Sequence, residues 1–216
     1  MEIEVKIRLP DRQTFDRALS AFERSSELLA KELQENYYFD TTSMQLERAD
    51  FALRLRRTAI LKPEELACGD SKGSVVSTIA LKSKPILVDG ISTVQELEDI
   101  IDDALVNQIL DNPDNFALKS KEHPILMELS KRFPNPSPFR LLGKFVNTRL
   151  VFSWLRFVVE LDRTEYDFGE GYEIELEHSD AEAAKGELTQ FLETNDIPYT
   201  FSKGNKLSNM VLGKIV

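Results

Sequence analysis

Cysteine and histidine, the residues of thiol and imidazole chemistry, are scarce in this chain. Cys68 is the single cysteine among 216 residues, so the chain cannot form an internal disulfide. His123 and His178 are the only histidines, and neither lies in a segment typical of a nucleophilic turn. The chain therefore has few residues that could serve Ser/His/Asp or Cys/His catalysis. It also has few that could form a zinc site of thiolates and imidazoles. A bound metal is expected to have oxygen ligands, which favours Mg²⁺ or Mn²⁺.

The chain has fewer basic than acidic residues, and it has no long apolar run. The chain has 27 Lys and Arg against 37 Asp and Glu, a net charge of −10. An acidic protein is a poor non-specific ligand for nucleic acid, so we expect no nucleic-acid partner. No run approaches the length of a transmembrane helix, so we expect no membrane partner. The charged N-terminus predicts no signal peptide, and with the single cysteine it favours a cytoplasmic location.

Size and composition indicate one globular domain over residues 1–216. Apolar residues make up 42% of the chain and charged residues 30%, values typical of a folded protein. A chain of this length can bury a sizeable core. We expect a monomer.

The N-terminal segment alternates charged and aliphatic residues. It reads Glu2-Ile3-Glu4-Val5-Lys6-Ile7-Arg8-Leu9. On a β-strand, this period of two places all the charges on one face and all the aliphatic side chains on the other. Such a face carries carboxylates and cations together, as a pocket needs if it holds both a metal and a polyanion.

Same-face charged pairs recur along the chain. They are Arg54 and Arg56, Lys82 and Lys84, Glu160 and Asp162, and Glu173 and Glu175, which Glu177 continues. These pairs predict a sheet with one charged and one apolar face. If the sheet closes, its apolar face packs outward on helices and its charged face lines a wet interior. The alternative is an ordinary solvated face of an antiparallel sheet. Because the acidic pairs and the basic pairs fall on different strands, we favour a cavity with one acidic and one basic wall.

The remaining pattern predicts a mainly antiparallel sheet with flanking helices, because most strands follow one another through turns. Helices are predicted at 11–29, with Asp11 as the cap, and at 93–110, 124–132 and 180–194. Further strands are predicted at 33–40, 50–58, 74–84, 144–152, 155–163 and 171–178. We expect an exposed loop at 61–73, a turn at Asp89-Gly90, a helical connection or insert at 111–140, and a short final helix after Lys206.

Several of these motifs together resemble the CYTH superfamily, the triphosphate tunnel metalloenzymes. The resemblance rests on Glu2-x-Glu4-x-Lys6, Leu53-Arg54-Leu55-Arg56, Lys82-x-Lys84, Asp89-Gly90-Ile91-Ser92, Tyr166-Asp167-Phe168-Gly169 and Tyr172-Glu173-Ile174-Glu175. It extends from Met1 to about Leu207 and is strongest to the plant-type tripolyphosphatase branch. It implies an α+β fold in which helices flank an eight-stranded antiparallel β-barrel, a tunnel whose charged interior binds a linear triphosphate.

The resemblance also implies roles for particular residues. The phosphate-binding wall would consist of Lys6, Arg54, Arg56, Lys82, Lys84, Arg149 and Lys206. The metal-binding wall would consist of Glu2, Glu4, Glu96, Glu160, Asp162, Glu173 and Glu175. Glu2, Glu4, Glu173 and Glu175 are the implied catalytic acids. Glu96 falls inside the predicted helix 93–110, so its role rests on the resemblance alone. Two interpretations stay open for Arg8, a phosphate ligand or the structural partner of an acid at the tunnel mouth.

The implied activity is metal-dependent hydrolysis of inorganic triphosphate to pyrophosphate and phosphate, with Mg²⁺ or Mn²⁺ as cofactor and the small triphosphate as partner. Thiamine triphosphatase is an alternative, although that branch carries a Trp where this chain has Ala52, and the sole Trp is Trp154. A class IV adenylyl cyclase is a second alternative, but no sequence feature supplies a base pocket. A non-catalytic polyphosphate- or nucleotide-binding module is a third, although both walls are present.

Overall fold

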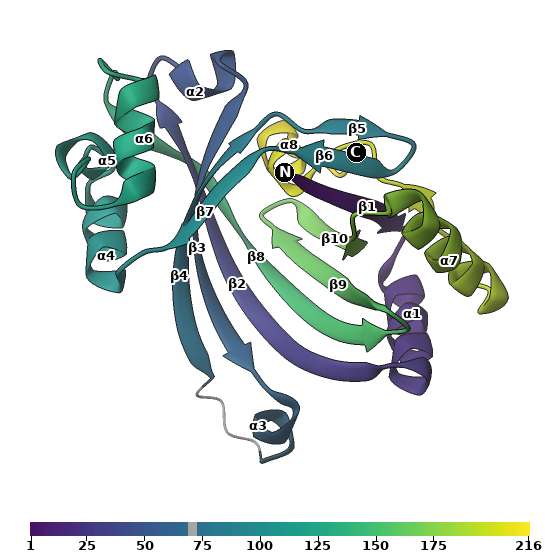
Figure 1. Cartoon of the computed structure of the whole chain (residues 1–216). Helices are drawn as coiled ribbons and strands as arrows, with labels where there is room; N and C mark the ends of the chain where they lie inside the picture. The colour runs from purple at the N-terminus through teal and green to yellow at the C-terminus, as the bar shows by residue number, and fades with distance from the viewer. Residues whose placement is uncertain (69–72) are drawn as a thin grey trace.

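The computed structural model describes residues 1–68 and 73–216, and this part of the chain contains eleven strands and eight helices (Figure 1). The strands are β1 (Glu2–Leu9), β2 (Glu27–Thr41), β3 (Phe51–Leu61), β4 (Ser74–Ser83), β5 (Ile86–Val88), β6 (Ile91–Val94), β7 (Glu96–Ile100), β8 (Phe139–Trp154), β9 (Phe157–Tyr166), β10 (Gly169–Glu177) and β11 (Thr200–Phe201). The helices are α1 (Arg12–Ser25), α2 (Gln45–Arg48), α3 (Pro63–Cys68), α4 (Asp103–Asp111), α5 (Asn115–Leu118), α6 (Pro124–Arg132), α7 (Ala181–Thr194) and α8 (Lys206–Leu212).

The strands form one strongly curled antiparallel sheet. Its order is β5-β6-β1-β10-β9-β8-β2-β3-β4-β7, with β11 added on β1. The path returns to the same stretch of chain, because β6 pairs with β1 near one end, β7 pairs with β4 at the other end, and only Gln95 separates β6 from β7. The predicted antiparallel tunnel flanked by helices is thus confirmed. The strand count exceeds eight because residues 91–100 are divided into two strands and the short β5 and β11 are added.

Alternation along β1 shows why the sheet has one apolar and one charged face. Val5, Ile7 and Leu9 are buried in an apolar core, as the period of two predicts. Lys6 and Arg8 lie between them in the sequence and project to the opposite face, where both contact carboxylates. The apolar residues therefore face helices and the charged residues face the interior.

Two apolar cores cover the outer face of the sheet (Figure 1). One lies between β1, β8, β9, β10 and the helices α1 and α7, and it includes Phe22, which packs against Phe152, Trp154 and Phe191. The other lies between β2, β3, β4 and the helices α4, α5 and α6. Because the helices cover the outside, the interior is left to polar side chains.

Several sequence predictions need correction. The helix predicted at 93–110 is wrong, because residues 91–100 form β6 and β7 and only Asp103–Asp111 is helical. Val94, Leu97 and Ile101 have helical spacing, but Leu97 is 46% exposed and the acids at 96 and 98 alternate as in a strand. Tertiary pairing with β1 and β4 overrode the local pattern.

Other boundaries also moved. The strand predicted from residue 33 begins at Glu27, and the one predicted from residue 144 begins at Phe139. Residues 63–68 of the loop predicted at 61–73 form α3, and 69–72 lie outside the described residues. The segment 111–140 carries the end of α4, then α5 and α6, before β8 begins. The predicted cap of the first helix is confirmed, since Asp11 Oδ1 accepts a hydrogen bond from Thr14 N at 2.8 Å.

The turn between β5 and β6 requires glycine. Asp89 and Gly90 have φ values of +48° and +79°, as in a hairpin turn with left-handed central residues. A Cβ on Gly90 would collide with the ring of Phe201, and the Gly90 carbonyl accepts a hydrogen bond from Lys6 N at 2.7 Å.

Replacement of Gly90 by Ala is expected to destabilise the fold by about 2 kcal/mol, because strain at positive φ adds to the clash with Phe201. Denaturant unfolding of both proteins measures this difference. Gly186→Ala is the matched control, since a Cβ there meets no atom within 4 Å and the residue lies inside α7. Equal stability of Gly90→Ala and the wild type would contradict the steric argument.

Within the described residues, none of the helices combines the length and apolarity needed to cross a membrane.

Candidate functional site

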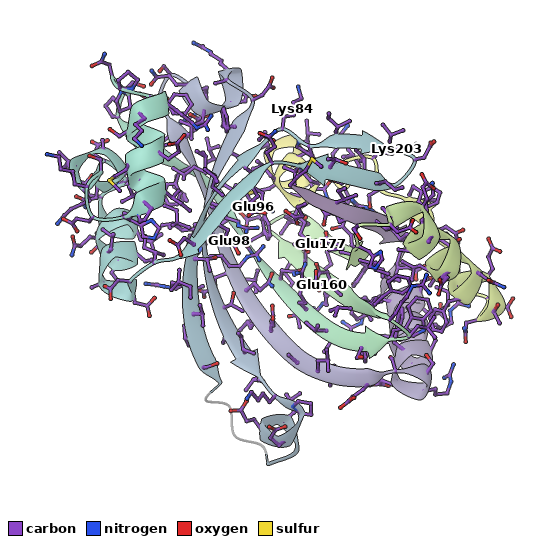
Figure 2. All side chains as sticks on the ribbon, in the orientation of Figure 1. Lys84, Glu96, Glu98, Glu160, Glu177 and Lys203 are labelled. Atoms are coloured by element: carbon purple, nitrogen blue, oxygen red, sulfur yellow. The ribbon has the colours of Figure 1, made fainter. Side chains whose placement is uncertain are left out.

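The curled sheet encloses a cavity of about 1390 Å³. Twelve of the fourteen residues to which the resemblance gives roles line it: Glu2, Glu4, Lys6, Arg54, Arg56, Lys82, Lys84, Glu96, Arg149, Glu160, Glu175 and Lys206. Glu177, which continues the acidic face of β10, lines it as well. Figure 2 shows Glu96, Glu98 and Glu160 toward the interior, whereas Lys84 and Lys203 lie at the rim. The same-face pairs from distant segments thus meet around one space.

Asp162 and Glu173 lie beneath the cavity. Asp162 is fully buried, and Glu173 is 3% exposed. Arg149 binds Asp162 through two hydrogen bonds of 2.8 and 2.7 Å, and Lys206 Nζ lies 2.9 Å from Asp162 Oδ2 and 3.0 Å from Glu173 Oε2. These two acids therefore support the cations that line the cavity.

Glu175 is the centre of this network. Its carboxylate accepts hydrogen bonds from Lys6 and Lys206 at 2.6 Å and from Arg149 at 2.7 Å. Burial acts to raise the pKa of Glu175, but the three cations outweigh it and hold that pKa well below the usual value. The three cations thus favour the charged form of Glu175, and its carboxylate holds the side chains of Lys6, Arg149 and Lys206 in place.

A second set of ion pairs lies where β3, β4 and β7 meet the start of β1. Lys82 Nζ lies 2.5 Å from Glu96 Oε2 and 3.4 Å from Glu2 Oε2. Arg54 contacts Glu96 at 3.2 Å and also pairs with Glu98. Sequence analysis missed Glu98, and the signal that reveals it is its spacing of two from Glu96 on a strand.

Three carboxyl groups of the cavity have raised pKa values. Burial raises the pKa of Glu2, with a contribution from the adjacent Glu96, and burial also raises the pKa of Glu4. Burial raises the pKa of Glu160 to about 7, although Arg149 opposes the shift. These acids hold protons more readily than ordinary carboxyl groups, as expected where burial disfavours the charged form.

Arg56 differs from the other cations of the interior. In the described part of the chain no carboxylate forms an ion pair with it, and its Nε donates a hydrogen bond to Asn36 Oδ1 at 2.8 Å. Burial lowers the pKa of Arg56 to about 10, and the neighbouring Arg54 and Arg149 add to the effect. Its positive charge is therefore available to an anion in the cavity.

The acidic and basic residues are not segregated as the sequence predicted. Lys6 faces Glu175, Arg8 faces Glu173, and Arg149 faces Asp162 across paired strands, while Lys82 faces Glu96. Strands of opposite charge are hydrogen-bonded neighbours, so the charges interleave. Positive charge that carboxylates do not fully offset is found where Arg56 lies near Arg54 and Arg149.

Two further sequence predictions concern the edges of the site. Arg8 donates to Glu173 Oε1 at 2.9 Å and is 8% exposed, and it is not among the residues that line the cavity. Of its two interpretations, the structure supports the structural pair. Lys84 follows β4 at the rim, where its exposed side chain lies 3.2 Å from Asp50 Oδ1.

The chain is similar to a known family and to solved structures over nearly its whole length. A model described as the CYTH domain matches residues 1–206. HpAC1 from Hippeastrum, a candidate adenylyl cyclase for which a dominant triphosphatase activity is described, matches with a TM-score of 0.88 and 32% identity, covering 100% of this chain and 98% of that one. A candidate adenylate cyclase from Bacillus halodurans matches with a TM-score of 0.62 and 25% identity, covering 97% and 96%.

A curated relative is similar to this chain over nearly its whole length. The protein YjbK of Bacillus subtilis (strain 168), named as a candidate triphosphatase, is 26% identical over 207 residues, which are 96% of this chain and 92% of that protein. The family model spans almost all of this chain, and the fold and the charged cavity agree with it. The chain belongs to the CYTH family.

Proposed function

We propose that this protein is a metal-dependent triphosphatase that cleaves inorganic triphosphate to pyrophosphate and phosphate. The observation that carries the proposal is the cavity of about 1390 Å³ that Arg54, Arg56 and Arg149 line, in which Arg56 lies near the other two and, within the described residues, is the one of the three without a carboxylate partner. Grouping arginines in a buried space is unfavourable unless a polyanion binds there. The triphosphatase activity described for HpAC1 and the name of YjbK support triphosphatase chemistry.

The cationic side chains are suited to hold the phosphates. Arginine presents a planar fork of donors that matches phosphate oxygens, and lysine adds a compact charge. In the proposal, Arg54, Arg56 and Arg149 contact the substrate. Lys6, Lys82 and Lys206 line the same cavity and exchange part of their carboxylate contacts for phosphate contacts.

The carboxylates that line the cavity suit a hard divalent cation. Glu2, Glu4 and Glu96 offer only oxygen donors, which Mg²⁺ and Mn²⁺ prefer. Burial raises the pKa of Glu2 and of Glu4, and a bound cation would favour the charged form of both groups. Within the described residues, however, no group of three or more Asp, Glu, His or Cys side chains is arranged as a metal site. The fit therefore lies in the chemistry of the donors. A bound cation would supply neutralisation of phosphate charge.

The proposed reaction needs a water, a base and a stabilised leaving group. The water oxygen attacks the terminal phosphorus, the bond to the bridging oxygen breaks, and pyrophosphate leaves with that oxygen. The proton from the water passes to a carboxylate with a raised pKa, for which Glu2 and Glu4 are suited. Arg149 and Lys206 neutralise charge on the departing oxygens. Glu173 and Glu175 position those cations through ion pairs.

The test offers inorganic triphosphate, ATP and thiamine triphosphate separately to the purified protein with Mg²⁺, with Mn²⁺ and with EDTA. Phosphate and pyrophosphate from triphosphate, lost in EDTA, support the proposal. Cyclic AMP from ATP would instead identify a cyclase, and tight binding without any product would identify a binding module. Thiamine triphosphate is expected to be a poor substrate, because Trp154 is buried against Phe22 and Phe157, and Ala52 is the cavity residue beside Arg54.

Arg54→Ala is expected to weaken binding more than turnover. The variant removes a phosphate contact and also leaves Glu96 and Glu98 without their arginine partner. We expect KM to rise about tenfold or more, the cost of one charge-assisted hydrogen-bonded contact, with a smaller fall in kcat. Steady-state kinetics over a wide range of triphosphate concentrations separate the two. An unchanged KM would contradict the assignment of Arg54.

A further inference from the structure

A neutral side chain holds Arg56, whereas carboxylates hold the other cations of the interior. Asn36 lies directly opposite Arg56 across the β2–β3 pair, and the Asn36 side chain is 1% exposed. Its Oδ1 accepts the hydrogen bond from Arg56 Nε at 2.8 Å. Within the described residues, Lys6, Arg54, Lys82, Arg149 and Lys206 each form at least one ion pair with a carboxylate.

Hydrogen bonding fixes the orientation of the Asn36 amide. The guanidinium of Arg56 can only donate, and the backbone carbonyl of Gln34 can only accept. Asn36 Nδ2 donates to that carbonyl at 3.2 Å, so Oδ1 must face Arg56. The amide satisfies both neighbours at once, whereas a carboxylate would place a second acceptor against the Gln34 carbonyl.

We propose that Asn36 is a positioning residue that orients Arg56 through Nε while leaving its positive charge uncompensated for phosphate. This inference rests on the proposed function, because it assigns the phosphate of the same substrate to Arg56. A carboxylate at this place would pair with the guanidinium, as Glu175 pairs with Lys6 and Asp162 with Arg149. The phosphate would then have to displace an ion pair before it could bind.

The decisive variant is Asn36→Asp, which keeps size and shape and adds one negative charge beside Arg56. We expect the Kd for inorganic triphosphate in EDTA, measured by calorimetry, to rise at least about tenfold. With Mg²⁺, KM is expected to rise more than kcat falls. Asn36→Ser, which is smaller and neutral, is expected to raise Kd by only a few-fold, because the charge of Arg56 stays available.

Asn147→Asp is the matched control. Asn147 is also 1% exposed, and it donates to Gln34 Oε1 at 3.2 Å and accepts from Thr164 Oγ1 at 2.8 Å. The substitution adds the same charge without contact to Arg56. We expect thermal stability to fall, because a donor is lost and a carboxylate is buried, whereas Kd stays within about threefold of the wild type.

A double-mutant cycle distinguishes a role of Asn36 that acts through Arg56 from a merely structural role. In the Arg56→Ala background, Asn36→Asp and Asn36→Ser are expected to have no further effect on Kd. An equal loss of affinity in Asn36→Asp and Asn147→Asp, or additive effects in the cycle, would overturn the inference. If Asn36→Asp does not fold, Asn36→Ser in the cycle decides alone.

The inference and the proposed function fail in different ways. Wild-type protein that binds triphosphate without cleaving it overturns the hydrolase, and the inference stands if Asn36→Asp weakens that binding. If the wild type hydrolyses triphosphate and Asn36→Asp has the same Kd and KM as the wild type, only the inference is overturned. Wild-type protein that does not bind triphosphate overturns both.

Discussion

Glu4→Gln is expected to lower kcat for triphosphate hydrolysis by about 100-fold or more while the fold stays intact. Glu4 lies in the cavity on β1, 3.1 Å from Lys6, and burial raises its pKa. Glutamine keeps the size of the side chain but can neither accept a proton from water nor contribute negative charge to a divalent cation. The loss therefore falls on the chemical step and persists at saturating substrate.

Activity as a function of Mg²⁺ concentration measures this prediction, and Glu2→Gln is expected to behave in the same way. Glu35→Gln is the matched control, since Glu35 lies on β2 but points away from the interior, where Tyr37 contacts it. That variant is expected to keep wild-type kinetics. Wild-type turnover of Glu4→Gln with an ordinary dependence on Mg²⁺ would exclude Glu4 from the reaction and from metal binding.

Asp162→Asn is expected to give the largest loss of stability among single substitutions in the site. Asp162 is fully buried and binds both Arg149 and Lys206. An amide cannot neutralise these cations, and removal of one partner of a buried ion pair destabilises a protein by about 3 kcal/mol. Denaturant unfolding at pH 7 in EDTA measures the difference.

The stability that Asp162 contributes is expected to fall at low pH. Burial acts to raise the pKa of Asp162, but Arg149 and Lys206 outweigh it and lower that pKa to about 2, below the usual value of 3.8. The carboxylate therefore stabilises the fold above about pH 4, and this stabilisation is lost as the pH falls through about 2. In Asp162→Asn this part of the acid dependence is expected to disappear.

Asp16→Asn is the control for the acid-dependence experiment. Asp16 pairs with Arg12 on the exposed side of α1, where the two side chains are 54% and 52% exposed. An exposed pair of this kind contributes little, so the change is expected to stay within about 0.5 kcal/mol. A loss as small as this in Asp162→Asn would mean that water or other carboxylates replace Asp162 around Arg149 and Lys206.

Local patterning determined much of the site before any tertiary information. The period of two in Glu2–Leu9 and in the segments around Arg54, Lys82, Glu160 and Glu173 was sufficient to predict strands with one charged face. The same alternation predicted which side chains face the interior, because successive residues of a strand point to opposite faces. Alternation did not reveal Glu96 and Glu98, because the apolar residues around them have the spacing of a helix. The strand β7 was therefore predicted as part of a helix.

What the sequence by itself determined is which side chains face the interior, because alternation along a strand is a local property. What only the tertiary structure decided is which charges meet. Strand order places Glu175 among Lys6, Arg149 and Lys206, buries Asp162 beneath the cavity, and leaves Arg56 opposite the neutral Asn36. The pairing of charges depends on the register between strands that are distant in sequence, and no local pattern specifies that register.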